Sequence, residues 1–121
     1  MMSPGRANTY FLVLYFFTAL LYLLPLPFNF IGFVPGDNGD THPNLWPFWY
    51  YPYALTTGNG GIFFHRLLFY PEGIHLVYTS SSTLGALLMA PIALAISAAA
   101  ALNTWLVLHL WLGGWFMFKF C

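Results

Sequence analysis

Apolar and polar positions divide this chain into three parts. No charged residue lies between Arg6 and Asp37 or between Glu72 and Lys119, and four of the six charged residues fall from Asp37 to Glu72. An apolar, polar, apolar order is typical of membrane segments joined by an exposed loop. The pattern predicts a single all-α integral membrane domain over residues 1–121. We expect about three transmembrane helices and one long extracytoplasmic loop that carries short interfacial helices.

The first apolar run predicts a transmembrane helix at about residues 9–27. Its core, YFLVLYFFTALLYLLPL, approaches the roughly 20 apolar residues that cross a bilayer. A cleaved signal peptide is the alternative, because Arg6 precedes an apolar stretch near the start of the chain. No small-residue cleavage site follows, so an uncleaved anchor is favoured. Arg6 then places the amino terminus in the cytoplasm, because positive charges prefer that side.

The second apolar run is long enough for two crossings. We expect transmembrane helices at about 83–101 and 103–120, joined by a turn near Asn103. The first of the pair is rich in Ala and Gly, which let helices approach closely. Pro91 lies within it and can be tolerated if neighbouring helices satisfy the carbonyl that it frees.

The polar segment between the two runs, about residues 31–82, is expected on the extracytoplasmic side. Asn44 could cap a short helix that starts at Leu45. Four aromatic residues then recur at helical spacing on one face of that helix: Trp46, Trp49, Tyr50 and Tyr53. An aromatic face of this kind is typical of a helix lying at the level of the lipid headgroups.

The composition strengthens the membrane interpretation. The chain has 121 residues, of which 60% are hydrophobic, 21% aromatic and 5% charged, whereas a soluble domain has about 25% charged residues. We therefore expect a multi-pass protein of the cell membrane, with the bilayer as its partner. Three Lys+Arg balance three Asp+Glu, and this lack of a basic surface excludes nucleic-acid binding. The single cysteine, Cys121, cannot form an internal disulfide or a thiol metal cluster.

Candidate chemistry begins with two carboxylates beyond the first apolar run. In GDNGD, Asp37 and Asp40 are three positions apart. Carboxylates at this place could act as a general base toward a hydroxyl or hold a divalent cation. Asp-Asn-Gly is also ordinary turn chemistry. In the catalytic interpretation Asp37, nearer the membrane helix, is the expected catalytic residue, and Asp40 is its helper or a metal ligand.

The same loop carries candidate substrate-binding residues. A guanidinium can bind phosphate or reach the lipid headgroups, and aromatic rings can stack on a sugar or form an interfacial belt. The candidates are Arg66, Glu72, Trp46 and Trp49.

The histidines divide into two groups. The spacing of the loop histidines matches no zinc pattern, so we expect them to be solvated; they are His42, His65 and His75. His109 lies within the last apolar run. We expect it to face the bundle interior and to bond to a neighbouring helix.

The order of motifs resembles a known family. After the first apolar run and GDNGD come NLWPFWYYPYAL, LFYPEGIHLVYTSS, LGALLMAPIALAI and LNTWLVLHLWLGGWFMF. Over about residues 9–118 this order resembles the amino-terminal part of multi-pass GT-C-type glycosyltransferases and related membrane proteins. The resemblance implies an acidic catalytic motif at Asp37 and Asp40 and a sugar donor linked to polyprenyl phosphate. The chain departs from the family in having few membrane segments and in having DNGD where an adjacent or alternate acidic pair is common.

The expected function is therefore sugar transfer from a polyprenyl-phosphate donor at the extracytoplasmic face. The last apolar run is barely finished at Cys121, so we expect the chain to be the amino-terminal portion of a larger polytopic glycosyltransferase. Two alternatives are a non-catalytic transporter or lipid-handling subunit, and a truncated chain without independent function. A transporter more often has ionisable residues within its helices, where this chain has only His109.

Overall fold

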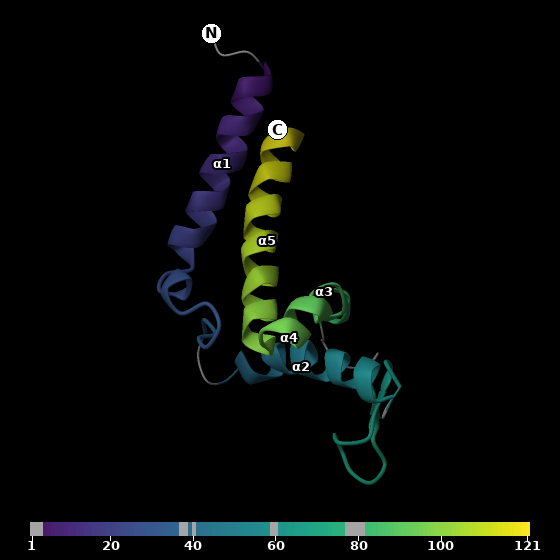
Figure 1. The fold of residues 1–121 in the computed structure, drawn as a ribbon. Coiled ribbons are helices and arrows are strands. Elements are labelled where there is room, and N and C mark those ends of the chain that lie inside the picture. Colours follow the sequence, from purple (N-terminus) through teal and green to yellow (C-terminus); the bar gives the residue numbers. More distant parts are fainter. Residues whose placement is uncertain (1–3, 37–38, 40, 59–60, 77–81) are drawn as a thin grey trace.

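The computed structural model describes residues 4–36, 39, 41–58, 61–76 and 82–121. Its longer helices are α1 (Pro4–Tyr22), α2 (Thr41–Thr57) and α5 (Ala98–Phe120), and its shorter ones are η1 (Leu26–Phe28), α3 (Thr83–Leu88) and α4 (Ala90–Ala95). Two short strands, β1 (Phe64–His65) and β2 (Ile74–His75), pair in antiparallel register. In Figure 1, α1 and α5 run side by side with both chain ends together, and α2 crosses the opposite end of the pair.

The α1–α5 pair is held mainly by aromatic side chains. The Trp111 indole nitrogen donates a hydrogen bond of 2.9 Å to the Leu12 carbonyl. The Trp111 ring also packs edge-on against Phe16, with 5.3 Å between ring centroids. Gly114 lets α1 come close, because a Cβ at this position would lie 2.8 Å from the Tyr15 ring. Residues about 100 positions apart in the sequence therefore form one antiparallel helix pair.

Among the described residues, α5 is the helix that is long and apolar enough to cross a membrane. Its 23 residues rise about 34 Å, compared with a hydrocarbon core of about 30 Å. Only 22% of its apolar window is buried within the molecule, which is unlike the core helix of a soluble protein. The apolar part of α1, Asn8–Tyr22, is shorter. The helical, apolar character is confirmed, and the multi-pass arrangement stays a prediction.

The expected transmembrane helix at 83–101 is not a continuous helix. The chain forms α3 and α4, of six residues each, with a break at Met89. Six helical residues rise about 9 Å, so neither helix can cross a bilayer. The break has a local cause. Pro91 lies in the first turn of α4, where a residue without an N–H is well tolerated, so the proline begins a new helix instead of interrupting one.

The expected turn near Asn103 is also wrong, because this residue lies inside α5. The chain reverses earlier, at Ile96 and Ser97. Ser97 has an extended backbone, and its side-chain oxygen accepts a 3.0 Å hydrogen bond from the Ala100 amide. This is the geometry of a helix amino-terminal cap, and it fixes where α5 begins.

Asn103 has a different structural role. It is fully buried, and its side-chain amide donates to the carbonyls of Phe30 at 2.8 Å and Phe33 at 2.6 Å. Ser97 donates to the carbonyl between them, that of Ile31, at 3.0 Å. These bonds attach the turn after η1 to α5, and they satisfy backbone carbonyls that have no partner in a helix or sheet.

The aromatic helix α2 begins at Thr41, four residues before the predicted start at Leu45. The expected aromatic face forms two stacked pairs, Trp46 on Tyr50 and Trp49 on Tyr53. This face is not entirely superficial, because Tyr50 is only 2% exposed.

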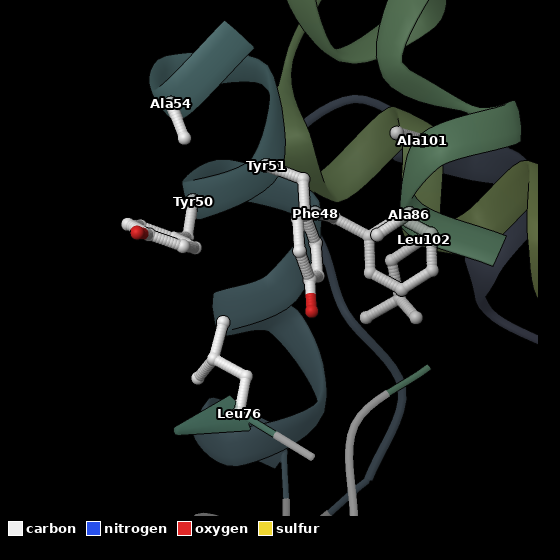
Figure 2. Close-up of a cluster of buried hydrophobic side chains, with 8 residues drawn as sticks. All are labelled: Phe48, Tyr50, Tyr51, Ala54, Leu76, Ala86, Ala101 and Leu102. Carbon is white, nitrogen blue, oxygen red and sulfur yellow. The ribbon is translucent and has the colours of Figure 1, made fainter. Parts of the chain in front are cut away.

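The opposite side of α2 forms much of the core. Figure 2 shows Phe48 and Tyr51 of α2 facing Ala86 and Ala101, two small residues that leave room for the rings. The Tyr51 hydroxyl lies 2.8 Å from the Thr83 hydroxyl at the start of α3. Ring packing and this hydrogen bond together fix α2 across the end of α5.

Candidate functional site

A cavity of about 520 Å³ lies where α1 ends, α2 begins and α5 passes between them. We call it the foot cavity. Apolar side chains make up most of its wall, including Leu23, Phe48, Leu102 and Leu106. A few polar residues from three different parts of the chain share the wall: Thr41, Asn44, Ser82, Trp105 and His109. An apolar enclosure with a few polar groups is the usual form of a small-molecule site.

The predicted catalytic residues, Asp37 and Asp40, lie outside the described residues. Their immediate neighbours do not: Gly36 precedes Asp37, Thr41 follows Asp40, and both neighbours line the foot cavity. Gly36 has a positive φ of 128°, and a Cβ there would lie 2.5 Å from the Thr41 hydroxyl. The close approach of these two residues therefore requires glycine.

On the α5 side of the foot cavity, His109 is placed by Trp105. The His109 Nδ1 atom lies 3.1 Å from the Trp105 carbonyl. Because a carbonyl only accepts hydrogen bonds, Nδ1 must carry the proton, which leaves a lone pair on Nε2. The prediction that His109 bonds to a neighbouring helix is wrong, since its bond lies within α5 and its side chain is exposed. The Nε2 atom can accept a proton or a hydrogen bond from a hydroxyl group.

Trp105 is held in place by α3 and by Ser82, the residue directly before α3. Its indole nitrogen donates to the Ser82 hydroxyl at 3.1 Å. Its ring packs edge-on against His109, with 4.0 Å between centroids. The ring also lies directly over Gly85, where any side chain would overlap it. The short helix α3 therefore supports one wall of the foot cavity.

A second hollow of about 580 Å³ lies at the opposite end of α2. We call it the outer groove. It is lined by Tyr50 and Tyr53 of α2 and by the segment from Phe64 to Leu67. Thr41, Asn44 and Phe48 of α2 line the foot cavity, whereas Tyr50 and Tyr53 line the outer groove, so the two hollows share no described lining residue.

The candidate substrate-binding residues do not form one cluster. Arg66 is exposed and lines the outer groove, and Glu72 is exposed between β1 and β2 and lines neither hollow. Trp46 is half-buried against Tyr50, with ring centroids 4.8 Å apart. Trp49 is 47% exposed.

His65 is the residue that the sequence interpretation placed most wrongly. It is 1% exposed instead of solvated, with its ring 3.9 Å from that of Tyr50 and 4.7 Å from that of Trp46. Its Nδ1 accepts hydrogen bonds from the Leu67 and Leu68 amides, both at 3.0 Å. Burial lowers the pKa of His65. The apolar run GIFF directly before this histidine was the available signal.

Of the other loop histidines, His75 lines neither hollow. His75 is exposed and packs edge-on against Phe64, and the side chain of His42 is not among the described parts. Within the described residues, no group of three or more His, Cys, Asp or Glu side chains could hold a metal ion. The predicted divalent cation depends on Asp37 and Asp40 and stays a prediction.

No protein-family model, curated protein or solved structure matches this chain. The resemblance to GT-C-type glycosyltransferases therefore stays a prediction.

Proposed function

We propose that the chain is the amino-terminal portion of a membrane glycosyltransferase whose foot cavity holds a polyprenyl-phosphate sugar donor. One observation carries the proposal: a largely apolar cavity is lined by the two residues that bracket the segment from Asp37 to Asp40. A lipid-linked sugar requires this combination, an apolar enclosure for its isoprenoid chain beside polar groups for its head. Each CH₂ group buried there contributes about 0.8 kcal/mol.

The proposed reaction assigns roles to Asp37, Asp40 and His109. The hydroxyl oxygen of an acceptor attacks the anomeric carbon of the donor sugar. The bond from that carbon to the phosphate oxygen breaks, and the polyprenyl phosphate leaves with the electron pair. Asp37 accepts the hydroxyl proton and Asp40 assists it; if a divalent cation were bound, Asp40 would hold it and the cation would supply positive charge for the leaving phosphate. His109, with its lone pair on Nε2, is the second candidate for the base.

The apolar surface supports placing this site at a membrane. In the proposed arrangement α1 and α5 cross the bilayer as an antiparallel pair, with α2 and the foot cavity at the extracytoplasmic surface. Large apolar side chains of α1 are exposed, such as Phe17 at 57% and Leu21 at 67%. Lipid contact would cover these side chains and would let a donor reach the foot cavity from within the bilayer.

The test is transfer from a polyprenyl-phosphate sugar by the full-length protein in membranes. Asp37→Asn keeps the shape and the hydrogen-bonding capacity of the turn but removes the base, so the rate should fall about 10²- to 10⁴-fold. The rate of Asp40→Asn should fall less than that of Asp37→Asn. Glu72→Gln is the control, because it removes a carboxylate that lines neither hollow. If both aspartate variants transfer at the wild-type rate with unchanged expression, the enzymatic proposal should be dropped.

The apolar wall also favours one alternative, a non-catalytic lipid-handling subunit. In that case the foot cavity would bind polyprenyl phosphate equally well in the wild type and in Asp37→Asn, and no transfer would be measured with any acceptor. A bulky substitution behind the wall, Gly85→Leu, should weaken lipid binding in either case, because it displaces Trp105, which lines the foot cavity. This variant therefore tests the foot cavity separately from its chemistry.

A further inference from the structure

The outer groove has a polar lining that the proposed transfer does not use. Its described lining includes one positive charge, Arg66, and no carboxylate. The rings of Tyr50, Tyr53 and Phe64 form its apolar part. Neither the Arg66 guanidinium nor the Tyr53 hydroxyl bonds to another described residue. Within the described lining, two hydrogen-bond donors therefore lack an internal acceptor, and Arg66 supplies the one charge.

The floor of the outer groove is built by defined hydrogen bonds. The Tyr50 hydroxyl lies 3.2 Å from the carbonyl oxygens of both Gly61 and Phe64, and it shares its proton between them. Burial, followed by the neighbouring Tyr51 and Tyr53, raises the pKa of Tyr50, so this phenol stays protonated as a donor. The bond pins the segment before β1 to α2.

His65 fixes the position of Arg66. Its Nδ1 accepts hydrogen bonds from the backbone amides of Leu67 and Leu68, which follow Arg66 in the chain. Arg66 is thereby enclosed in a small hydrogen-bonded turn whose base is a buried ring. The guanidinium extends from a backbone that is already ordered, which lowers the entropy lost on binding.

His65 also supplies a buried donor without an acceptor. Because Nδ1 accepts two hydrogen bonds, the proton of the neutral ring must be on Nε2. This Nε2 is buried and has no hydrogen-bond partner among the described residues, and the ring that carries it belongs to a residue lining the outer groove. A buried N–H without an acceptor is rare, so a small movement of the surrounding side chains would let a ligand oxygen in the groove supply the missing acceptor.

We propose that the outer groove binds a phosphate group, with Arg66 and Tyr53 as donors at its rim and the Nε2–H of His65 as the donor below them. All three groups donate, so a ligand that itself donates would leave them unpaired. A carboxylate is planar and is satisfied by the guanidinium fork alone, whereas a phosphate has oxygens for donors that come from several directions. The rings of Tyr50 and Tyr53 suit the apolar face of the group that carries the phosphate. The proposal does not depend on glycosyl transfer.

The experiment is a titration of the full chain in nanodiscs of zwitterionic phosphatidylcholine, observed by amide NMR. The probes are inorganic phosphate, glucose 1-phosphate and glucose. Inorganic phosphate and glucose 1-phosphate should shift the Leu67 and Leu68 amides in a saturable way, and glucose should not. Arg66→Gln should weaken binding by about 10- to 100-fold, because it removes a charge-assisted hydrogen bond. Lys119→Gln is the matched control, since it removes a positive charge outside the outer groove.

Two further variants keep the proposal testable if Arg66→Gln is poorly folded. Arg66→Lys retains the charge but loses the fork, and it should bind with intermediate affinity. In His65→Asn the side-chain oxygen can replace Nδ1 as acceptor for the turn, but the Nε2 donor is lost, so binding should weaken about 2- to 10-fold. Equal affinity of the wild type, Arg66→Gln and Arg66→Lys for both phosphate probes would overturn the proposal.

A second arm identifies the source of the phosphate. Phosphatidylcholine also carries a phosphate, but its choline neutralises that charge; nanodiscs with added phosphatidylglycerol present a net anionic lipid phosphate at the membrane surface, without any soluble ligand. Shifts at Leu67 and Leu68 with this lipid alone would assign the outer groove to a headgroup, and shifts with the soluble probes would assign it to a free phosphate ester. No shift with any probe would contradict the proposal. Because the measurement is binding, its result is independent of whether the foot cavity catalyses transfer.

Discussion

At the scale of single residues, burial decides the chemistry of His65. Its Nδ1 lone pair accepts two backbone N–H groups, and its ring is covered by Tyr50 and Trp46. Protonation of Nδ1 would bury a positive charge. It would also place the new N–H of the ring against the N–H groups of Leu67 and Leu68, which would lose their acceptor. Burial accordingly lowers the pKa of His65 below its ordinary 6.5, and no described carboxylate lines the adjoining groove to offset this effect.

The sign of the resulting pH dependence follows from proton linkage. Below pH 6.5 the unfolded chain binds a proton at this histidine more readily than the folded one, so stability falls as the pH decreases. Hydrogen exchange at Leu67 and Leu68, corrected for intrinsic rates, should therefore show weaker protection at pH 5 than at pH 7.5. His65→Asn should abolish the difference and His75→Asn should retain it; the same pH dependence in His65→Asn would exclude His65 as its origin.

Asn103 gives a second prediction at this scale. Asn103→Asp keeps the size of the side chain but removes the two donors to the carbonyls of Phe30 and Phe33. Because these carbonyls then lack a partner and a carboxylate is buried beside them, we expect a loss of about 3 kcal/mol or more. Thr104→Val, which removes one local bond to Ala100, should cost less than about 1 kcal/mol. Denaturant unfolding in detergent measures both, and equal losses would contradict the role of Asn103.

At the scale of helices, glycine decides which face of α5 meets α1. Gly114 and Gly113 are neighbours, yet a Cβ on Gly114 would press into the Tyr15 ring, whereas a Cβ on Gly113 would meet nothing within 4 Å. The two positions are about 100° apart around the helix, so they report a packed and an open side of it in the same sequence context.

We expect Gly114→Leu to destabilise the protein by about 1 to 3 kcal/mol relative to Gly113→Leu, because leucine overfills the α1–α5 contact. Both variants gain the same helix propensity, so the difference between them isolates packing. Thermal unfolding in detergent, followed by tryptophan fluorescence, gives the comparison. Equal melting temperatures would show that α1 does not pack on this face.

The sequence predicted some helices well and misplaced others, for identifiable reasons. The first apolar run correctly indicated a helix, but α1 ends at Tyr22 and not at the predicted position of about 27, because Pro25 and Pro27 cannot continue an α-helix. The segment from 83 to 101 was misjudged because apolar length alone does not reveal that Pro91 and Ser97 each begin a helix. Asn103 suggested a turn because polarity cannot distinguish an exposed residue from one that bonds to carbonyls 70 and 73 positions away.

The candidate site was predictable only in part. The positions of Asp37 and Asp40 in a glycine-flanked segment are visible in the sequence. The wall that Trp105 and His109 supply depends on α5 passing the end of α1, which no local pattern encodes. The burial of His65 likewise depends on rings from α2, about 15 to 20 positions earlier in the chain.

At the scale of the whole molecule, the helix arrangement predicts how the chain lies in a membrane. The start of α1 and the end of α5 lie at the same end of the helix pair (Figure 1), and α2 lies at the other end. Two crossings would place Cys121 and the outer groove on opposite sides of the bilayer. Three crossings, as expected from apolar length, would place them on the same side.

An impermeant thiol reagent distinguishes the two topologies. The native Cys121 provides one site, and Leu67→Cys combined with Cys121→Ser provides the other; both positions are exposed. In intact cells we expect Leu67→Cys to be labelled and Cys121 to be protected until the membrane is permeabilised. Labelling of both in intact cells would favour three crossings.

The position of α5 in the chain has a consequence for biosynthesis. This helix packs against α1, α2, α3 and α4, but the ribosome makes it after all of them. At about 5 to 20 residues per second, the 23 residues of α5 take on the order of seconds to emerge. During that interval α1 lacks the helix that it packs against, and the carbonyls of Phe30 and Phe33 lack the hydrogen bonds that the Asn103 side-chain amide donates. A nascent chain stalled before Ala98 should therefore remain bound to the insertion machinery, and release should coincide with the arrival of α5.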